Sequence, residues 1–95
     1  MSKAADLHKS RVAALGCIIK DCGKPAALHH PRFAVGMSQR ASDFLVIPLC
    51  PDHHQNGGHG VAIHAGQATF EQNFGSEPEL LAQTIERLQE EQQCH

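Results

Sequence analysis

Two pairs of metal-ligand residues constrain this chain more than any other feature of its sequence. Cys17 and Cys22 are separated by four residues, and Cys50 and His53 are separated by two. Each spacing lets both side chains of a pair converge on one ion from a tight turn, and three cysteines with one histidine are typical of tetrahedral structural zinc. The sequence therefore predicts a structural zinc site that ties together two segments distant in the chain.

The composition explains why such a site would matter. The chain has 95 residues, of which 4% are aromatic, with four Phe and neither Trp nor Tyr. A domain of this size buries a modest core, and a metal or disulfides often stabilise it. No stretch resembles a signal peptide or a membrane span, so we expect a cytoplasmic protein with reduced thiols. The alternative is that Cys17, Cys22 and Cys50 are simply small buried apolar residues. Under either hypothesis, Cys94 has no assigned role.

Turn residues and apolar patterns predict an α+β fold with little sheet, in one domain over residues 1–95. Residues 1–10 are polar and expected to be loose, and a short helix is expected at 10–16, capped by Ser10 and ended by Gly16. The other predicted elements are strands at 26–30 and 44–50, a helical turn at 51–56, and a helix at 67–74.

The last predicted helix, over residues 76–93, carries the clearest local signals. Ser76 and Glu79 match an S-x-x-E capping box. Leu81, Ile85 and Leu88 recur at helical spacing and predict one apolar stripe. The stripe indicates that this C-terminal helix packs on the core.

A second group of histidines remains once the zinc ligands are assigned. Adjacent residues on a strand point to opposite faces, so of His29 and His30 one can bind an ion while the other faces a substrate. Neutral imidazoles leave positions on an ion for water and phosphate oxygens, and a free histidine suits a general base at neutral pH. The remaining candidates are His54, His59 and His64.

Several motifs, taken together, resemble a known group of nucleases. "HHPR", "IPLCPDHHQNGG" and "GVAIHAG" are similar to the HNH (ββα-metal, His-Me finger) endonucleases. With "RVAALGC", "GMSQRASD" and "TFEQNFG", they resemble the phage Ref family of recombination-enhancement nucleases, which are described as RecA-dependent. The resemblance extends over residues 8–88 and implies a zinc-stapled ββα-metal core, a metal-dependent DNA endonuclease activity, DNA as the substrate and a RecA filament as a candidate partner.

The resemblance also implies a role for individual residues. His30 would be the general base, with Asp43 as a candidate orienting acceptor near the place where many HNH enzymes have Asn. Arg32 and Arg40 flank the site and are candidates for phosphate contacts, the alternative being plain surface positions. The implied structural zinc ligands are Cys17, Cys22, Cys50 and His53, and the implied ligands of a catalytic Mg²⁺, Mn²⁺ or Zn²⁺ are His29, His54 and His64, with His59 as the alternative to His64.

The charge balance keeps other functions open. The formal net charge is -2 with histidines neutral, which argues against tight non-specific DNA binding by bulk charge alone. One rival hypothesis is a non-catalytic zinc module that binds nucleic acid or protein and needs only the Cys3His site. Another is a nuclease descendant that has lost its activity. The sequence does not determine the oligomeric state.

Overall fold

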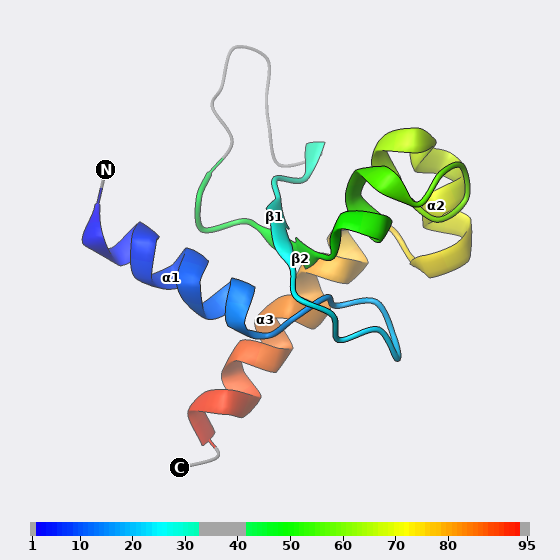
Figure 1. Ribbon diagram of the computed structural model, residues 1–95. Coiled ribbons are helices and arrows are strands. Elements are labelled where there is room, and N and C mark those ends of the chain that lie inside the picture. Colours follow the sequence, from blue (N-terminus) through cyan, green and yellow to red (C-terminus); the bar gives the residue numbers. More distant parts are fainter. Residues whose placement is uncertain (1, 33–41, 94–95) are drawn as a thin grey trace.

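The computed structural model describes residues 2–32 and 42–93 and consists of a two-stranded sheet surrounded by helices. Figure 1 shows the strands at the centre, with α1 on one side and α2 on the other. The fold is therefore a small α+β arrangement with little sheet. Its elements are α1 (Lys3–Ala14), β1 (Ala27–His29), β2 (Ile47–Leu49), η2 (Asp52–Asn56), η3 (Ile63–Ala65), α2 (Gln67–Phe74) and α3 (Glu77–Gln93).

Helix α1 begins well before the position that the sequence predicted. Residues 3–10 are helical rather than loose, and Ser10 lies inside the helix instead of capping it. The cap is Ser2, whose hydroxyl oxygen accepts a hydrogen bond from the Ala5 backbone N at 3.0 Å. Only Ala5 and Val12 of this helix are buried, so its apolar stripe is too narrow to recognise in the sequence. Packing against β1, β2 and α3 explains why the segment is helical nonetheless.

The chain leaves α1 through a turn that requires glycine. Gly16 has a φ of +77°, and a Cβ there would lie 2.9 Å from the carbonyl oxygen of Gly23. The close approach brings the Cys17 backbone N within 2.9 Å of the Lys24 carbonyl oxygen. Gly16 thus ends the helix, as predicted. It also starts the loop that carries Cys17 and Cys22, which we call the cysteine loop.

The two strands are short and antiparallel, with Ala27 opposite Leu49 and His29 opposite Ile47. The strand predicted over residues 44–50 is confined to its last part, and Phe44 lies exposed in the turn before it. Pro48 sits within β2, which is tolerated because every strand of a two-stranded sheet is an edge strand. Its carbonyl oxygen accepts a hydrogen bond of 2.9 Å from the Ile18 backbone N, so the cysteine loop is attached directly to the strand.

Two clusters of buried side chains form the core. The smaller lies between α1, β2 and α3 and contains Val12, Val46 and Leu88. The larger includes two of the cysteines and joins the cysteine loop, β2, η3, α2 and α3. Its members are Cys17, Ile18, Ile19, Ile47, Leu49, Cys50, Ile63, Phe70, Leu80 and Leu81.

Helix α3 has the cap that the sequence predicted, and it buries Leu81 and Leu88 of the predicted apolar stripe but not Ile85. The Glu79 backbone N donates to Ser76 Oγ at 3.2 Å, and the Ser76 backbone N donates to Glu79 Oε1 at 2.9 Å, which is a capping box. Ile85, expected in the apolar stripe, is 42% exposed, whereas Thr84 is buried and its hydroxyl donates to the Leu80 carbonyl oxygen. Across the described ranges, no helix is both long and apolar enough to cross a membrane.

Candidate metal centres

The four predicted zinc ligands lie together at one end of the larger core cluster. Their ligand atoms are all within 4.8 Å of one another and could hold a metal ion. The Sγ atoms of Cys22 and Cys50 are 3.8 Å apart, and His53 Nδ1 lies 3.5 Å from Cys17 Sγ and 3.1 Å from Cys50 Sγ. Ligands of a tetrahedral zinc with bonds of about 2.0 to 2.3 Å are separated by roughly 3.6 to 3.8 Å. The cluster therefore has the donor set and nearly the dimensions of a Cys3His zinc site.

The surroundings of the thiols favour a bound cation. Cys17 and Cys50 are 4% and 1% exposed, and none of the three cysteines is in a disulfide. Burial raises the pKa of the Cys17 thiol to about 12, so the thiolate needs a positive charge beside it. A divalent metal supplies that charge and deprotonates a coordinating thiol. Buried thiols that converge in this way fit a metal centre such as zinc.

Two tight turns present the four ligands. The Cys22 backbone N donates to the Ile19 carbonyl oxygen at 3.0 Å, in a turn where Asp21 adopts a φ of +66°. The second turn is η2, a single π-helical turn that follows Pro51 as predicted. Phe74 packs edge-on against the His53 ring, with centroids 5.1 Å apart, and so fixes that imidazole from the α2 side.

Three histidines form a second cluster beside the first. Ligand nitrogens of His29, His54 and His64 all lie within 4.8 Å of one another. The Nε2 atoms of His54 and His64 are 2.9 Å apart, and the His29 ring centroid lies 5.3 Å from each of the other two centroids. Two nitrogen ligands at about 2.05 Å from one ion and at right angles are separated by roughly 2.9 Å. The three imidazoles thus converge closely enough to share an ion.

The cluster is electrostatically suited to bind a cation. Burial lowers the pKa of His29, although Glu77 opposes that effect, and burial with repulsion from neighbouring imidazoles lowers the pKa of His54. Lowered pKa values keep both rings neutral at neutral pH, which leaves a lone pair for a metal. Since η2 also carries His53, the adjacent His54 places the second cluster next to the first.

His30 lies outside both clusters and is exposed, although it follows the buried His29 directly. Its Nε2 donates to Asp43 Oδ1 at 3.1 Å, and this hydrogen bond lowers the pKa of the Asp43 carboxyl. Lys9 Nζ lies 3.7 Å from Asp43 Oδ2, so α1 helps to hold the carboxylate. With Nε2 engaged, Nδ1 is the nitrogen of His30 that is left to accept a proton.

The structure places His59 away from the histidine cluster. Its Nδ1 donates to the Ala65 carbonyl oxygen at 3.2 Å, and its Nε2 accepts from the Thr69 hydroxyl at 3.1 Å. Both ring nitrogens are therefore occupied. His59 supports the turn that carries His64, and a Cβ on Gly66 would approach the His59 ring to 2.6 Å. Of the two alternatives raised by the sequence, the structure brings His64 to the cluster.

A small cleft opens beside the histidine cluster. It has a volume of about 290 Å³ and is lined by His29, His64 and Arg32, together with the residues that join η3 to α2. Arg32 is exposed, so its guanidinium is available to an anion. Arg40, the other predicted phosphate contact, lies outside the described residues.

Glu77 is a residue of this region that the sequence analysis did not single out. It is 2% exposed, and its Oε2 lies 2.6 Å from His29 Nε2. The two residues are 48 positions apart. Local spacing carries no signal for such a contact, and Glu79 in the same helical turn provides the recognisable capping motif.

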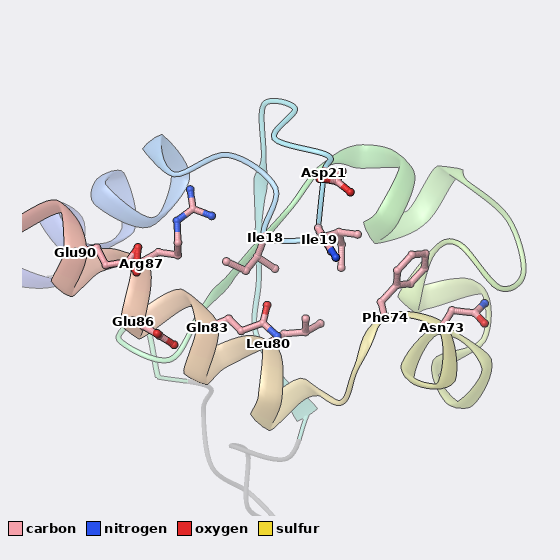
Figure 2. Close-up of a pocket in the computed structure, with 11 residues that line it drawn as sticks. Ile18, Ile19, Asp21, Asn73, Phe74, Leu80, Gln83, Glu86, Arg87 and Glu90 are labelled. Carbon is pink, nitrogen blue, oxygen red and sulfur yellow. The ribbon is translucent and has the colours of Figure 1, made fainter.

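A larger cleft, of about 680 Å³, contains none of the candidate ligands. Figure 2 shows Ile18 and Ile19 of the cysteine loop facing Leu80 of α3, with Phe74 at one end and Arg87 at the other. The two isoleucines directly follow Cys17 in sequence.

The fold and the ligand clusters define a small α+β protein with a candidate Cys3His metal centre. The chain belongs to a family described as proteins of unknown function (DUF968), which matches residues 7–90. It is also similar to the uncharacterized protein YdfU of Escherichia coli (strain K12), with 35% identity over 69 residues. That match covers 70% of this chain and 18% of the relative, so the chain spans less than a fifth of that protein's length. No solved structure matches the chain significantly.

Proposed function

We propose that the chain is a metal-dependent DNA endonuclease of the HNH (His-Me finger) type. The observation that carries the proposal is the position of His30, an exposed, carboxylate-oriented histidine that directly follows a member of a three-imidazole cluster. A zinc module that only binds a partner needs the Cys3His site but has no use for this arrangement. The antiparallel strands followed by a helical segment are consistent with a ββα-metal core.

Each side chain has a distinct role in the proposed hydrolysis. A divalent cation held by His29, His54 and His64 would act as a Lewis acid on the scissile phosphate and stabilise the leaving 3′-oxygen. His30 takes a proton from the attacking water at Nδ1, and the hydrogen bond to Asp43 holds the ring in place.

The substrate side of the proposal rests on charge and shape. Arg32 at the mouth of the small cleft is placed to contact a phosphate beside the histidine cluster. The net charge of -2 predicts weak non-specific affinity for DNA. The proposal includes a RecA filament, the partner that the sequence resemblance implies. Such a filament would recruit the chain to DNA.

The test is cleavage of supercoiled plasmid and of single-stranded DNA by the wild type and by His30→Ala, with Mg²⁺ or Mn²⁺ and with EDTA. We expect His30→Ala to lower the cleavage rate about 10²- to 10⁴-fold, because a general base contributes that much. Zinc content and folding should stay unchanged. His8→Ala is the matched control, since His8 stacks on Phe44 outside both clusters. Equal cleavage by His30→Ala and the wild type would contradict the nuclease proposal and favour a non-catalytic zinc module.

A further inference from the structure

Glu77 is a buried carboxylate whose hydrogen bonds all point to the region of the histidine cluster. Its Oε2 lies 2.6 Å from His29 Nε2, and the Arg32 backbone N donates to Oε1 at 3.0 Å and to Oε2 at 3.2 Å. Gln67 Nε2 donates to Oε1 at 3.2 Å. A buried charge is costly unless it is paired and hydrogen-bonded. These contacts, with the N-terminal position of Glu77 in α3, meet that requirement.

The short contact with Glu77 determines which nitrogen of His29 can bind a metal. A carboxylate accepts hydrogen bonds, so Nε2 of a neutral His29 carries the proton. The lone pair is then on Nδ1, which is the nitrogen available to an ion. A metal-ligating histidine commonly donates its other ring N–H to a carboxylate, which fixes the tautomer and makes the ligand more basic.

We propose that Glu77 is a positioning residue of the histidine cluster, which holds His29 as the Nε2–H tautomer with Nδ1 directed to the ion. The inference rests on the proposed function only in requiring that His29, His54 and His64 bind a divalent cation. It assigns to the N-terminus of α3 a part in that site, in addition to its part in the core. Because Glu77 also binds the Arg32 backbone, it sets the position of the whole segment from His29 to Arg32.

Direct ligation by Glu77 is the competing explanation. Among the described residues, the ligand atoms that converge at this site come from the three histidines alone. The carboxylate oxygens of Glu77 are not among them. The two roles predict different magnitudes. Loss of an outer carboxylate typically weakens metal affinity about 10- to 100-fold. Loss of one of three ligands should remove measurable binding, as we expect for His54→Ala.

The experiment measures both the tautomer and the affinity, with the Cys3His site kept loaded with zinc. Long-range ¹H–¹⁵N NMR of the metal-free histidine cluster reports which nitrogen of His29 is protonated. Isothermal titration with Ni²⁺ and with Mn²⁺ then gives the dissociation constant for the second ion. The variants are Glu77→Gln, Glu77→Ala and His54→Ala. Glu79→Gln is the matched control, since it makes the same change two residues away on the exposed side of the same helical turn.

We expect the Nε2–H tautomer in the wild type, and an affinity weakened about 10-fold by Glu77→Gln and up to about 100-fold by Glu77→Ala. Glu79→Gln should bind as the wild type does. A wild-type affinity in Glu77→Gln, or an Nδ1–H tautomer of His29, would overturn the inference and leave the nuclease proposal standing. Complete loss of binding in Glu77→Gln, as in His54→Ala, would make Glu77 a ligand instead. If Glu77→Ala does not fold, Glu77→Gln and the wild-type tautomer decide the question. Failure of the wild type to bind any second ion would overturn both proposals.

Discussion

The two ligand clusters are neighbours in the chain, since His53 belongs to one and His54 to the other, yet they differ in almost every physical respect. The Cys3His cluster lies largely in the core and offers four ligands, which fill a tetrahedral ion completely. The histidine cluster lies at the edge of the core, with His64 exposed, and offers three imidazole ligands. A filled site stabilises a fold, whereas a site with open positions can bind a substrate. One short helical turn thus connects a candidate structural centre to a candidate reactive one.

The largest expected effect comes from removing a ligand of the Cys3His cluster. Cys50→Ser should leave the chain unfolded or insoluble, because structural zinc contributes about 10 to 16 kcal/mol in zinc-finger peptides and a whole domain is stable by only about 5 to 15 kcal/mol. Circular dichroism melting and zinc analysis are the measurements. Lys24→Ala is the control, since Lys24 forms an exposed ion pair with Asp52 at the edge of the cluster. An unchanged melting curve for Cys50→Ser would show that the cluster does not hold the fold.

Removing a ligand of the histidine cluster should have the opposite result, because the chain should stay folded. His54→Ala is expected to lose the second ion and DNA cleavage while keeping zinc and the fold. The melting temperature should fall by no more than about 8 °C, which corresponds to roughly 1 kcal/mol in a domain of this size. Calorimetric titration and melting curves recorded on the same sample separate the two effects. Unfolding of His54→Ala would mean that both clusters are structural and would remove the contrast between them.

The carboxylate behind His30 should affect catalysis alone. Asp43→Ala removes the acceptor of the 3.1 Å hydrogen bond from His30 Nε2 and frees the imidazole to rotate. We expect cleavage about tenfold slower, since orientation of a base is part of its contribution, with both ions still bound. Lys9→Ala, which removes the more distant ion-pair partner of Asp43, should have a smaller effect. A wild-type cleavage rate in Asp43→Ala would show that Asp43 does not orient the base.

Among the histidines that the sequence offered as ligands of the second ion, the smallest effect on metal affinity is expected at His59, the alternative to His64. His59→Ala removes two hydrogen bonds from the turn that carries His64, each worth about 1 kcal/mol. The variant should melt at a lower temperature but keep the second ion within about tenfold of the wild-type affinity. His64→Ala, measured beside it, should lose the ion. The reverse pattern would make His59 the ligand and would require the turn to rearrange on metal binding.

The sequence was most informative where chemistry depends on local spacing. The Cys17–Cys22 and Cys50–His53 pairs converge in the structure, and Ser76 with Glu79 forms the capping box that their spacing indicates. Helix α2 ends at Phe74, before Gly75, because glycine there adopts a φ of +118° that other residues rarely reach. The spacing within each ligand pair, the capping box and the glycine at the end of α2 all involve residues close in the chain, whereas the meeting of the two pairs joins Cys22 to Cys50 across 28 positions.

Other features that depend on distant contacts were missed. The start of α1 depends on packing against the sheet and α3, and its buried residues, Ala5 and Val12, are too few to give a recognisable stripe. Which face of α3 is buried depends on the elements that pack against the helix. As a result, Thr84 is buried and Ile85 is exposed. The hydrogen bond of Glu77 to His29 joins the second half of the chain to the first, and no motif encodes it.

The most direct test of the contrast between the clusters is the metal stoichiometry of the wild-type chain before and after treatment with a mild chelator. After equilibration with Ni²⁺ or Mn²⁺, elemental analysis should find about one zinc and about one second ion per chain. The chelator should remove the second ion, leave the zinc in place and leave the circular dichroism spectrum unchanged. Simultaneous loss of both metals, or the absence of any second ion before treatment, would contradict the account of one filled and one open centre.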